Sequence, residues 1–213
     1  MKRRELIIIL PILILALVKY AYQGFVLNPF EIDQEFLAME AWNFLKDGNP
    51  TLIGAHTSVG GMYIGPCYTY LVYRVMWLTK LYPYSINALS VLWTTLTAVI
   101  LYFVGKKLFS KEVGLVAGLL AATSIAYLNI TEVPPLVIPL GLVSLLTFYS
   151  LSQLKTKRSM LFYSWLLAMI SIHLHFTGIY LAIFIMFWIL VNKIKLSIRN
   201  LVIGALMILI SLS

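Results

Sequence analysis

The sequence is poor in charge and in cysteine. Only 11% of the 213 residues are charged, whereas about a quarter are charged in an ordinary soluble domain. The single cysteine, Cys67, excludes a secreted fold held together by disulfides. Apolar residues fill the chain instead, since 61% of the residues are hydrophobic and the mean hydropathy is +0.92. A soluble core of this length cannot bury so much apolar surface, and the composition also excludes disorder, so it predicts a membrane protein.

Seven apolar segments approach the ~20 residues that a helix needs to cross the hydrocarbon core of a bilayer. They are Leu6–Tyr22, Ser85–Val104, Val113–Ile130, Pro134–Leu151, Met160–Ile172, Thr177–Val191 and Leu201–Ser213. An eighth segment, Pro66–Leu81, carries Arg74 in its middle and Lys80 near its end. An arginine at the centre of a bilayer costs about 2.5–3.5 kcal/mol. The sequence therefore predicts an all-α fold, a polytopic transmembrane helical bundle of about seven spans.

The basic residues are clustered. Twelve of the 16 lysines and arginines form four groups: Lys2, Arg3 and Arg4; Lys106, Lys107 and Lys111; Lys155, Lys157 and Arg158; Lys193, Lys195 and Arg199. All four groups share one face if Pro66–Leu81 does not cross, and the positive-inside rule makes that face cytoplasmic. We therefore predict a multi-pass protein of the plasma membrane, with a cytoplasmic N-terminus and Pro66–Leu81 as an interfacial helix. The net charge of +8 then marks short cytoplasmic loops, which removes the case for nucleic-acid binding.

Most of the groups that could do chemistry fall outside the membrane in this topology. The external acids and histidines are Glu31, Asp33, Glu35, Glu40, Asp47, Glu132, His56, His173 and His175. We therefore expect an extracytoplasmic active site. Residues 23–84 form one long external loop, in which we expect two interfacial amphipathic helices.

The first of these helices is predicted over Phe36–Lys46, and Gly48 and Pro50 end it. Its apolar face is expected to hold Leu37, Ala41, Phe44 and Leu45, with Glu40, Asn43 and Lys46 facing away. Asp33 is expected at its N-cap, where the backbone amides and the helix dipole favour an ionised carboxylate. Capping alone explains such an acid, and Glu35 is explained equally well as a residue of a solvated face.

A glycine-rich segment follows this helix. Gly60-Gly61-Met62-Tyr63-Ile64-Gly65-Pro66 permits tight turns and the close approach of a ligand, although a plain loop between two surface helices explains it equally well. An aromatic interfacial helix comes next, and then a span that ends in Gly105-Lys106-Lys107-Leu108-Phe109. With the start anchor and the external Asp33, this order resembles the type-C glycosyltransferase superfamily of polytopic membrane proteins. Within it, the chain looks closest to the branch of protein O-mannosyltransferases and aminoarabinose transferases.

The resemblance covers nearly the whole chain and implies one transmembrane module over residues 1–213. The chain lacks the later spans and the soluble domain of many members, so we expect it to be truncated or part of a longer or split protein with a C-terminal-half partner. The resemblance implies that a hexose or pentose is transferred, with inversion, from a polyprenyl-phosphate donor. The acceptor would be a lipid, a glycan or a protein on the extracytoplasmic face.

The resemblance also implies the catalytic residues. Asp33 matches the first-loop acid that acts as general base in the family. The family pattern there is Asp-Glu, whereas Gln34 follows here, so Glu35 is the substitute for the second carboxylate. Glu132 matches an acid at the external end of a later span. Asp33 and Glu132 together could hold a divalent cation, and metal dependence is left open.

Substrate-binding residues follow from the same comparison. Aminoarabinose transferases carry a phosphate-binding lysine at the position of Gly65, and its absence argues against that subgroup. Arg74, His56 and His175 are left as the candidates to bind phosphate, because each is a cation or a hydrogen-bond donor. Tyr63 could stack on the sugar, although interfacial anchoring explains a single aromatic residue equally well.

Two other functions stay open. A lipid or sugar transporter component is the first, but transporters place polar or broken helices at the middle of the membrane. Here the spans are nearly free of charge and the ionisable groups gather at the external rim. The second is a non-catalytic membrane subunit or remnant of such an enzyme, which the short final span favours.

Overall fold

The computed structural model describes residues 3–27, 30–49, 51–55, 63–124, 135–195 and 198–212. Over these ranges the chain is helical and contains no β-strand, which confirms the all-α fold class. The helices are α1 (Arg3–Tyr22), α2 (Ile32–Asp47), α3 (Cys67–Leu78), α4 (Ser85–Leu108), α5 (Lys111–Thr123), α6 (Leu140–Ser152), α7 (Met160–Leu174), α8 (Ile179–Val191) and α9 (Ile198–Leu212). A short π-helix, η1 (Gln23–Leu27), follows α1, and a 3₁₀ turn, η3 (Phe176–Gly178), precedes α8.

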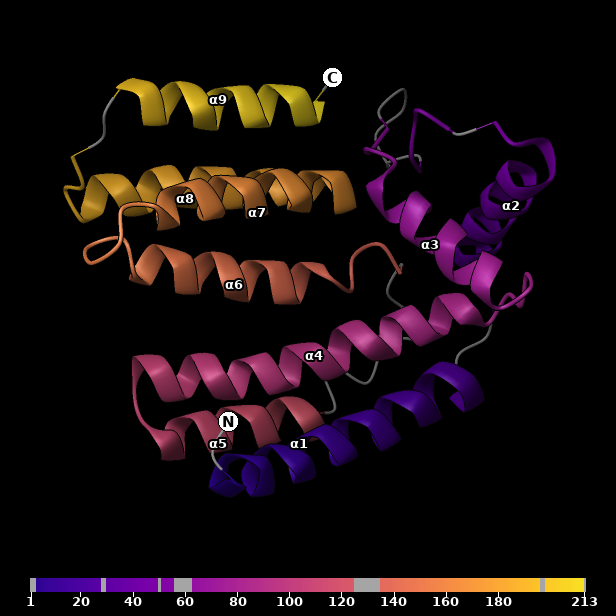
Figure 1. Ribbon diagram of the computed structural model, residues 1–213, viewed down its shortest axis with the longest axis horizontal. Coiled ribbons are helices and arrows are strands. Elements are labelled where there is room, and N and C mark those ends of the chain that lie inside the picture. The colour runs from indigo at the N-terminus through magenta and orange to yellow at the C-terminus, as the bar shows by residue number, and fades with distance from the viewer. Residues whose placement is uncertain are drawn as a thin grey trace.

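The helices fall into two groups. Figure 1 shows α1 and α4 to α9 side by side with nearly parallel axes, and α2 and α3 gathered at one end of that bundle. We call this end the capped end. The opposite end holds the start of α1, the α4–α5 and α6–α7 turns and the start of the α8–α9 connection, and we call it the basic end. Each of the seven apolar segments predicted from the sequence overlaps one helix of the bundle.

The predicted basic clusters meet at the basic end. Lys106 of α4 forms an ion pair with Glu5 of α1, and Arg158 donates from Nη1 to the carbonyl oxygen of Lys195 at 2.7 Å. These two contacts tie the start of α1 to the end of α4, and the α6–α7 turn to the α8–α9 connection. The expectation that the clusters share one side agrees with this arrangement, whereas the side of the membrane on which they lie stays a prediction.

Two helical stretches are long and apolar enough to cross a membrane. They are Glu5–Leu27, which has 23 residues and combines α1 with η1, and Ser85–Leu108, which has 24 residues and is α4. Three shorter apolar helices, Leu140–Ser152, Met160–Leu174 and Phe176–Val191, lie beside them. The count of seven spans and the interfacial position of α2 and α3 stay predictions.

Burial in the bundle is the reverse of that in a soluble protein. Large apolar side chains are exposed along α1 and α8, where Ile7 and Val18 are each 64% exposed and Leu190 is 70% exposed. Hydroxyl side chains are buried instead: Thr94 donates to the carbonyl oxygen of Ser90 at 2.8 Å, and Ser164 of α7 donates to the Ser150 hydroxyl of α6 at 3.1 Å. Apolar outer faces, and buried hydroxyls of which several bond to backbone or to one another, are typical of helices packed in lipid.

Small residues bring α4 and α5 into close contact, the most extensive in the bundle. A Cβ atom at Gly114 would lie 2.5 Å from the carbonyl oxygen of Tyr102 and 2.6 Å from the backbone nitrogen of Lys106. A Cβ atom at Gly118 would lie 2.9 Å from Cδ1 of Ile12. Gly114 and Gly118 are four residues apart, a spacing that allows membrane helices to approach backbone to backbone.

The C-terminus of α5 is held by the end of α1. Lys19 donates from Nζ to the carbonyl oxygen of Ser124, and the Tyr20 hydroxyl donates to that of Ala121, both at 2.6 Å. The last carbonyl groups of a helix have no partner within the helix, and a cation there also interacts favourably with the helix dipole. Lys19, which belongs to none of the basic clusters, therefore has a structural role.

At the capped end, α2 begins earlier than predicted. The N-cap residue is Glu31, with an extended backbone and no side-chain capping hydrogen bond, so the prediction of an Asp33 N-cap is wrong. The end of the helix is as predicted, because Gly48 adopts a left-handed conformation with φ of 69° and its N–H donates to the carbonyl oxygen of Phe44. Leu37 and Ala41 are fully buried, which confirms the centre of the predicted apolar face.

Helix α3 is shorter than the predicted segment Pro66–Leu81. It ends at Leu78, and the N–H of Leu81 donates back to the carbonyl oxygen of Met76 at 2.7 Å, while that of Lys80 donates to Trp77 at 3.3 Å. This pair of bonds is a Schellman motif, which requires a left-handed residue after the helix. Lys80 takes that conformation with φ of 55°, so the chain turns sharply into α4.

Candidate functional site

The first turn of α2 presents two carboxylates. Asp33 and Glu35 lie there, and both are exposed. Because the first amides of a helix lack partners within it, a negative charge here interacts favourably with the helix dipole, even though neither residue is the N-cap. Phe30, just before α2, lies 5.7 Å from the ring of Tyr84, just before α4. The carboxylates therefore lie where α2 meets the bundle.

The sequence predicts that Glu40 faces away from the apolar side of α2, but in the structure it does not. It is half-buried, and its charge acts on Tyr73 of α3. Burial is the main cause that raises the pKa of the Tyr73 phenol, and the charges of Glu40 and of the neighbouring Tyr70 raise it further. Glu40 follows Leu37 by three residues, so it shares the side of α2 that packs on α3. The spacing of Leu37 and Glu40 can be read from the sequence, whereas the position of Tyr73 opposite Glu40 cannot.

A groove of about 250 Å³ lies between α2 and α3. Its lining includes Phe44, Tyr70, Tyr73, Arg74 and Trp77. The rings of Phe44 and Tyr73 are stacked with centroids 4.6 Å apart, and the Arg74 guanidinium lies 4.9 Å from the ring of Trp77. Aromatic faces with an exposed cation beside them can hold a sugar and an anionic group. The predicted phosphate-binding residue Arg74 is thus part of a recognisable groove.

Asp33 and this groove are separated along α2. Asp33 precedes Phe44 by three helical turns, which corresponds to about 16 Å along the axis. The structure therefore does not bring the predicted base and the predicted phosphate-binding Arg74 to the same point.

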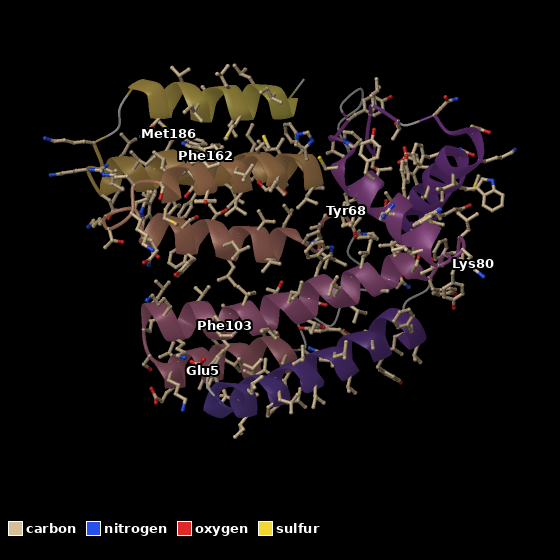
Figure 2. All side chains as sticks on the ribbon, in the orientation of Figure 1. Glu5, Tyr68, Lys80, Phe103, Phe162 and Met186 are labelled. Atoms are coloured by element: carbon tan, nitrogen blue, oxygen red, sulfur yellow. The ribbon has the colours of Figure 1, made fainter. Side chains whose placement is uncertain are left out.

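Three further buried polar groups come from α3, α4 and α7, and Figure 2 labels Tyr68 of α3, which lies where that helix meets the bundle. The Tyr68 hydroxyl, Nε1 of Trp93 and Nδ1 of His173 are buried and have no hydrogen-bond partner among the described residues. Tyr68 is 1% exposed, and burial raises the pKa of its phenol, so it stays a protonated donor. Each such group costs about 1–3 kcal/mol unless it is paired, so each is a candidate to bind a polar group of a ligand.

Gly65 explains why His173 fits there. A Cβ atom on Gly65 would overlap the imidazole ring of His173, so the last glycine of the glycine-rich segment admits this side chain. The sequence identified the glycines but assigned no role to His173, because the contact joins positions that are 108 residues apart. Only the three-dimensional structure reveals the pair.

The other predicted binding residues have different positions. His175 caps η3: its Nδ1 lies 2.8 Å from the Thr177 hydroxyl oxygen and accepts from the Thr177 N–H at 3.3 Å. Tyr63 is 49% exposed beside a backbone bridge in which the N–H of Ile64 donates to the carbonyl oxygen of Ala55 at 3.1 Å. His56 and Glu132 lie outside the described residues. Within the described part of the chain, no group of three or more acids, histidines or cysteines could hold a metal ion, and the cation site at Asp33 and Glu132 stays a prediction.

Comparison with known proteins supports the resemblance seen in the sequence. Neither the curated proteins nor the solved structures contain a match to this chain. The family model for dolichyl-phosphate-mannose-protein mannosyltransferase matches residues 64–213. This match takes in α3 to α9, with Arg74 and His173, and begins after α2 and Asp33. The chain belongs to the dolichyl-phosphate-mannose-protein mannosyltransferase family, a branch of the type-C glycosyltransferases.

Proposed function

We propose that the chain transfers a sugar, mannose in the first instance, from a polyprenyl-phosphate carrier to an acceptor at the capped end, outside the cytoplasm. The family match carries this proposal, since the family name implies a dolichyl-phosphate-mannose donor. The acids, aromatic residues and buried polar groups of the capped end support it. Seven helices would cross the membrane, with the basic end in the cytoplasm.

The chemistry requires three groups. The acceptor oxygen attacks the anomeric carbon, the bond from that carbon to the phosphate oxygen breaks, and its electron pair leaves with the lipid phosphate. A base removes the proton of the acceptor as the new bond forms. Donors or cations stabilise the departing phosphate. Attack from the face opposite the leaving group inverts the anomeric configuration.

Asp33 is the proposed base. Its carboxylate is exposed at the start of α2, where an acceptor hydroxyl can reach it. Glu35 lies one half-turn further on and is the second carboxylate available in that turn. If Glu132 contributes, it does so from the α5–α6 connection.

Because the structure does not bring Arg74 to Asp33, we propose that Arg74 and the groove beside it bind an anionic group of a substrate away from the reacting bond. The Arg74 side chain is exposed and stacks on Trp77, so its charge is available to an anion. Because Phe44, which lines the groove beside Arg74, lies about 16 Å along α2 from Asp33, changes at Asp33 and Arg74 should affect proton removal and binding separately.

The experiment uses membranes that contain only this chain, a panel of radiolabelled polyprenyl-phosphate sugars, and two variants. Asp33→Asn should lower sugar release by about 10²–10⁴-fold with donor binding unchanged, because only proton removal is lost. Arg74→Ala should weaken donor binding, and Asp47→Asn serves as the control for a charge change on α2, because Asp47 is exposed and does not line the groove. Turnover retained in Asp33→Asn would exclude Asp33 as the base.

A non-catalytic membrane subunit is the second candidate. The observation in its favour is that the family match begins at residue 64, after Asp33. Donor binding by the wild type without any release would support this function, and release that depends on Asp33 would exclude it.

A further inference from the structure

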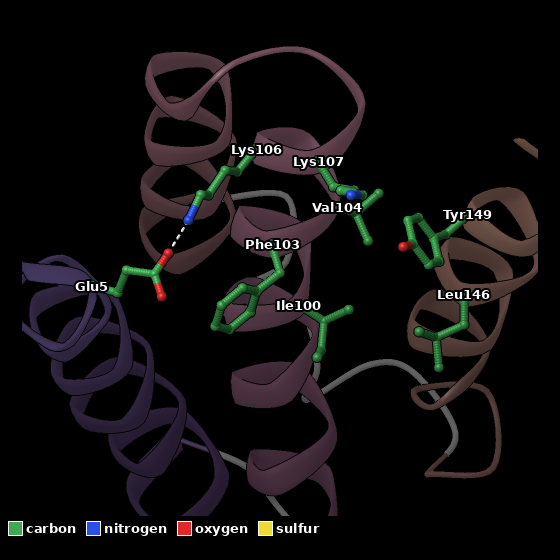
Figure 3. A pocket seen from close by; sticks show the side chains of 8 residues that line it. All are labelled: Glu5, Ile100, Phe103, Val104, Lys106, Lys107, Leu146 and Tyr149. Atoms are coloured by element: carbon green, nitrogen blue, oxygen red, sulfur yellow. Dashed lines mark hydrogen bonds and ion pairs between the residues drawn. The ribbon is translucent and has the colours of Figure 1, made fainter. Parts of the chain in front are cut away.

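A groove at the basic end has no part in the proposed transfer reaction. Figure 3 shows α4 between α1 and α6, with Ile100 and Val104 of α4 pointing towards Leu146 and Tyr149 of α6. The groove has a volume of about 510 Å³, within the ~300–1,000 Å³ that is usual for small-molecule sites. Since its α6 and α4 walls are largely aliphatic, it can accept a hydrocarbon chain.

The cytoplasmic mouth of this groove is cationic. Lys106 and Lys107 line it together with one acid, Glu5. Glu5 forms an ion pair with Lys106, which leaves one positive charge in excess. Lys107 is exposed and has no ion-pair or hydrogen-bond partner among the described residues. The Tyr149 hydroxyl, on the facing wall, is a further donor beside this charge.

We infer that this groove binds an anionic glycerophospholipid of the inner leaflet, with the phosphate at Lys107 and one acyl chain between α4 and α6. Charge complementarity identifies the ligand, because an apolar slot that opens on an unneutralised lysine matches a molecule with a hydrocarbon tail and an acidic headgroup. Basic pockets between membrane helices on the cytoplasmic side bind such headgroups. The inference rests on the proposed membrane arrangement and not on the transferase chemistry.

The site also explains why Lys106 and Lys107, two adjacent lysines of one basic cluster, differ in their surroundings. Lys106 is already held by Glu5 and lies 6.0 Å from the ring centroid of Tyr102, so it closes the groove on the α1 side. Lys107, one residue later, points to the other side of α4 and stays available. Two adjacent lysines thus have separate roles, one in joining α1 to α4 and one in binding the lipid.

The test measures binding of a fluorescent phosphatidylglycerol to the full chain purified in detergent, with phosphatidylcholine as the uncharged comparison. Wild type should prefer phosphatidylglycerol. Lys107→Gln should weaken its binding about fivefold, the effect expected for one lysine near an anionic lipid surface. Lys111→Gln is the matched control, because Lys111 is an exposed lysine at the same end that does not line the groove, and it should change binding less than twofold.

A second variant tests the hydrocarbon slot. Ile100→Trp fills it and keeps both lysines, so saturable binding should be lost while circular dichroism shows the native helix content. Three results would overturn the inference: equal loss in Lys107→Gln and Lys111→Gln, equal binding of phosphatidylcholine, or competition by glycerol phosphate as strong as that by the lipid. The last would indicate a site for a soluble anion. None of these readouts depends on sugar transfer, so failure here leaves the proposed enzyme function untouched.

Discussion

The two ends of the helical bundle are built on different principles. At the basic end, short turns join the helices, and isolated contacts such as the ion pair between Glu5 and Lys106 connect them. At the capped end, two additional helices pack on the bundle, and their core includes Leu37, Tyr68 and Leu174, which come from three distant parts of the chain. The basic end is thus defined by where charge is placed along the sequence, and the capped end by tertiary packing.

This difference separates topology from chemistry. Clustered lysines and arginines in short turns can set the orientation of the chain without any three-dimensional site. A site for a sugar phosphate needs groups from several helices at fixed positions, and the groove between α2 and α3 at the capped end brings Arg74 together with aromatic residues. Changes at the two ends should therefore affect different properties of the protein, and the predictions below run from the largest effect to the smallest.

The largest effect on stability is expected at Gly114, where α5 packs against α4. Gly114→Val places side-chain atoms against the backbone of α4, which cannot move aside, and should lower the free energy of unfolding by about 3 kcal/mol. Gly48→Ala is the comparison at the capped end: its φ is 69° but no atom lies within 4 Å of the added Cβ, so only backbone strain of about 1 kcal/mol is expected. Thermal unfolding in detergent measures both, and equal losses would contradict the close α4–α5 contact.

The second prediction concerns the pair formed by Gly65 and His173. Gly65→Ala overlaps the imidazole and should cost about 2 kcal/mol, since the half-buried ring must be displaced. Adding His173→Ala removes the overlap and should restore stability. If the buried Nδ1 of His173 binds a substrate, sugar release should stay low in the double variant. Recovery of both stability and release would show that His173 only fills space.

The sequence was sufficient for much of the fold, because hydropathy is a local property. The seven apolar segments, the end of α2 at Gly48 and the grouping of Lys106, Arg158 and Lys195 at one end all follow from composition, turn residues and charge. The start of α2 was misplaced, since an acid in the first turn and an acid at the N-cap have the same dipole advantage.

The candidate site was less accessible from the sequence. Arg74 was identified, and the structure adds the groove around it. Glu40 and His173 were not assigned any role, because each gains its meaning from a neighbour on another helix, Tyr73 and Gly65 respectively. His175 makes a local contact with Thr177 that the sequence did not indicate, and its place at the substrate stays a prediction.

The third prediction addresses the link between α1 and α5. Lys19→Met removes the cation from the C-terminus of α5 and should cost about 1 kcal/mol. Lys19→Arg keeps the charge and a donor and should unfold within error of the wild type. A thermal scan of the three proteins in one detergent gives the comparison. Equal destabilisation by Met and Arg would assign the effect to the shape of the side chain.

The smallest effect on stability is expected at the basic end, for the pair formed by Glu5 and Lys106. Both side chains are partly exposed, at 28% and 32%, and ion pairs in such positions contribute little because water and salt screen them. Glu5→Gln and Lys106→Gln, alone and together, should leave the unfolding midpoint unchanged within error.

The influence of these two variants should appear instead in membrane topology. The accessibility of Cys67 to an impermeant maleimide, added outside intact cells, reports that topology. Lys106→Gln removes a positive charge from a short turn and should increase the fraction of chains with Cys67 protected, whereas Glu5→Gln removes a negative charge, which has little weight in the positive-inside rule, and should not. If both variants destabilised the fold and neither changed the labelling, the contrast between an end defined by charge and an end defined by packing would be lost.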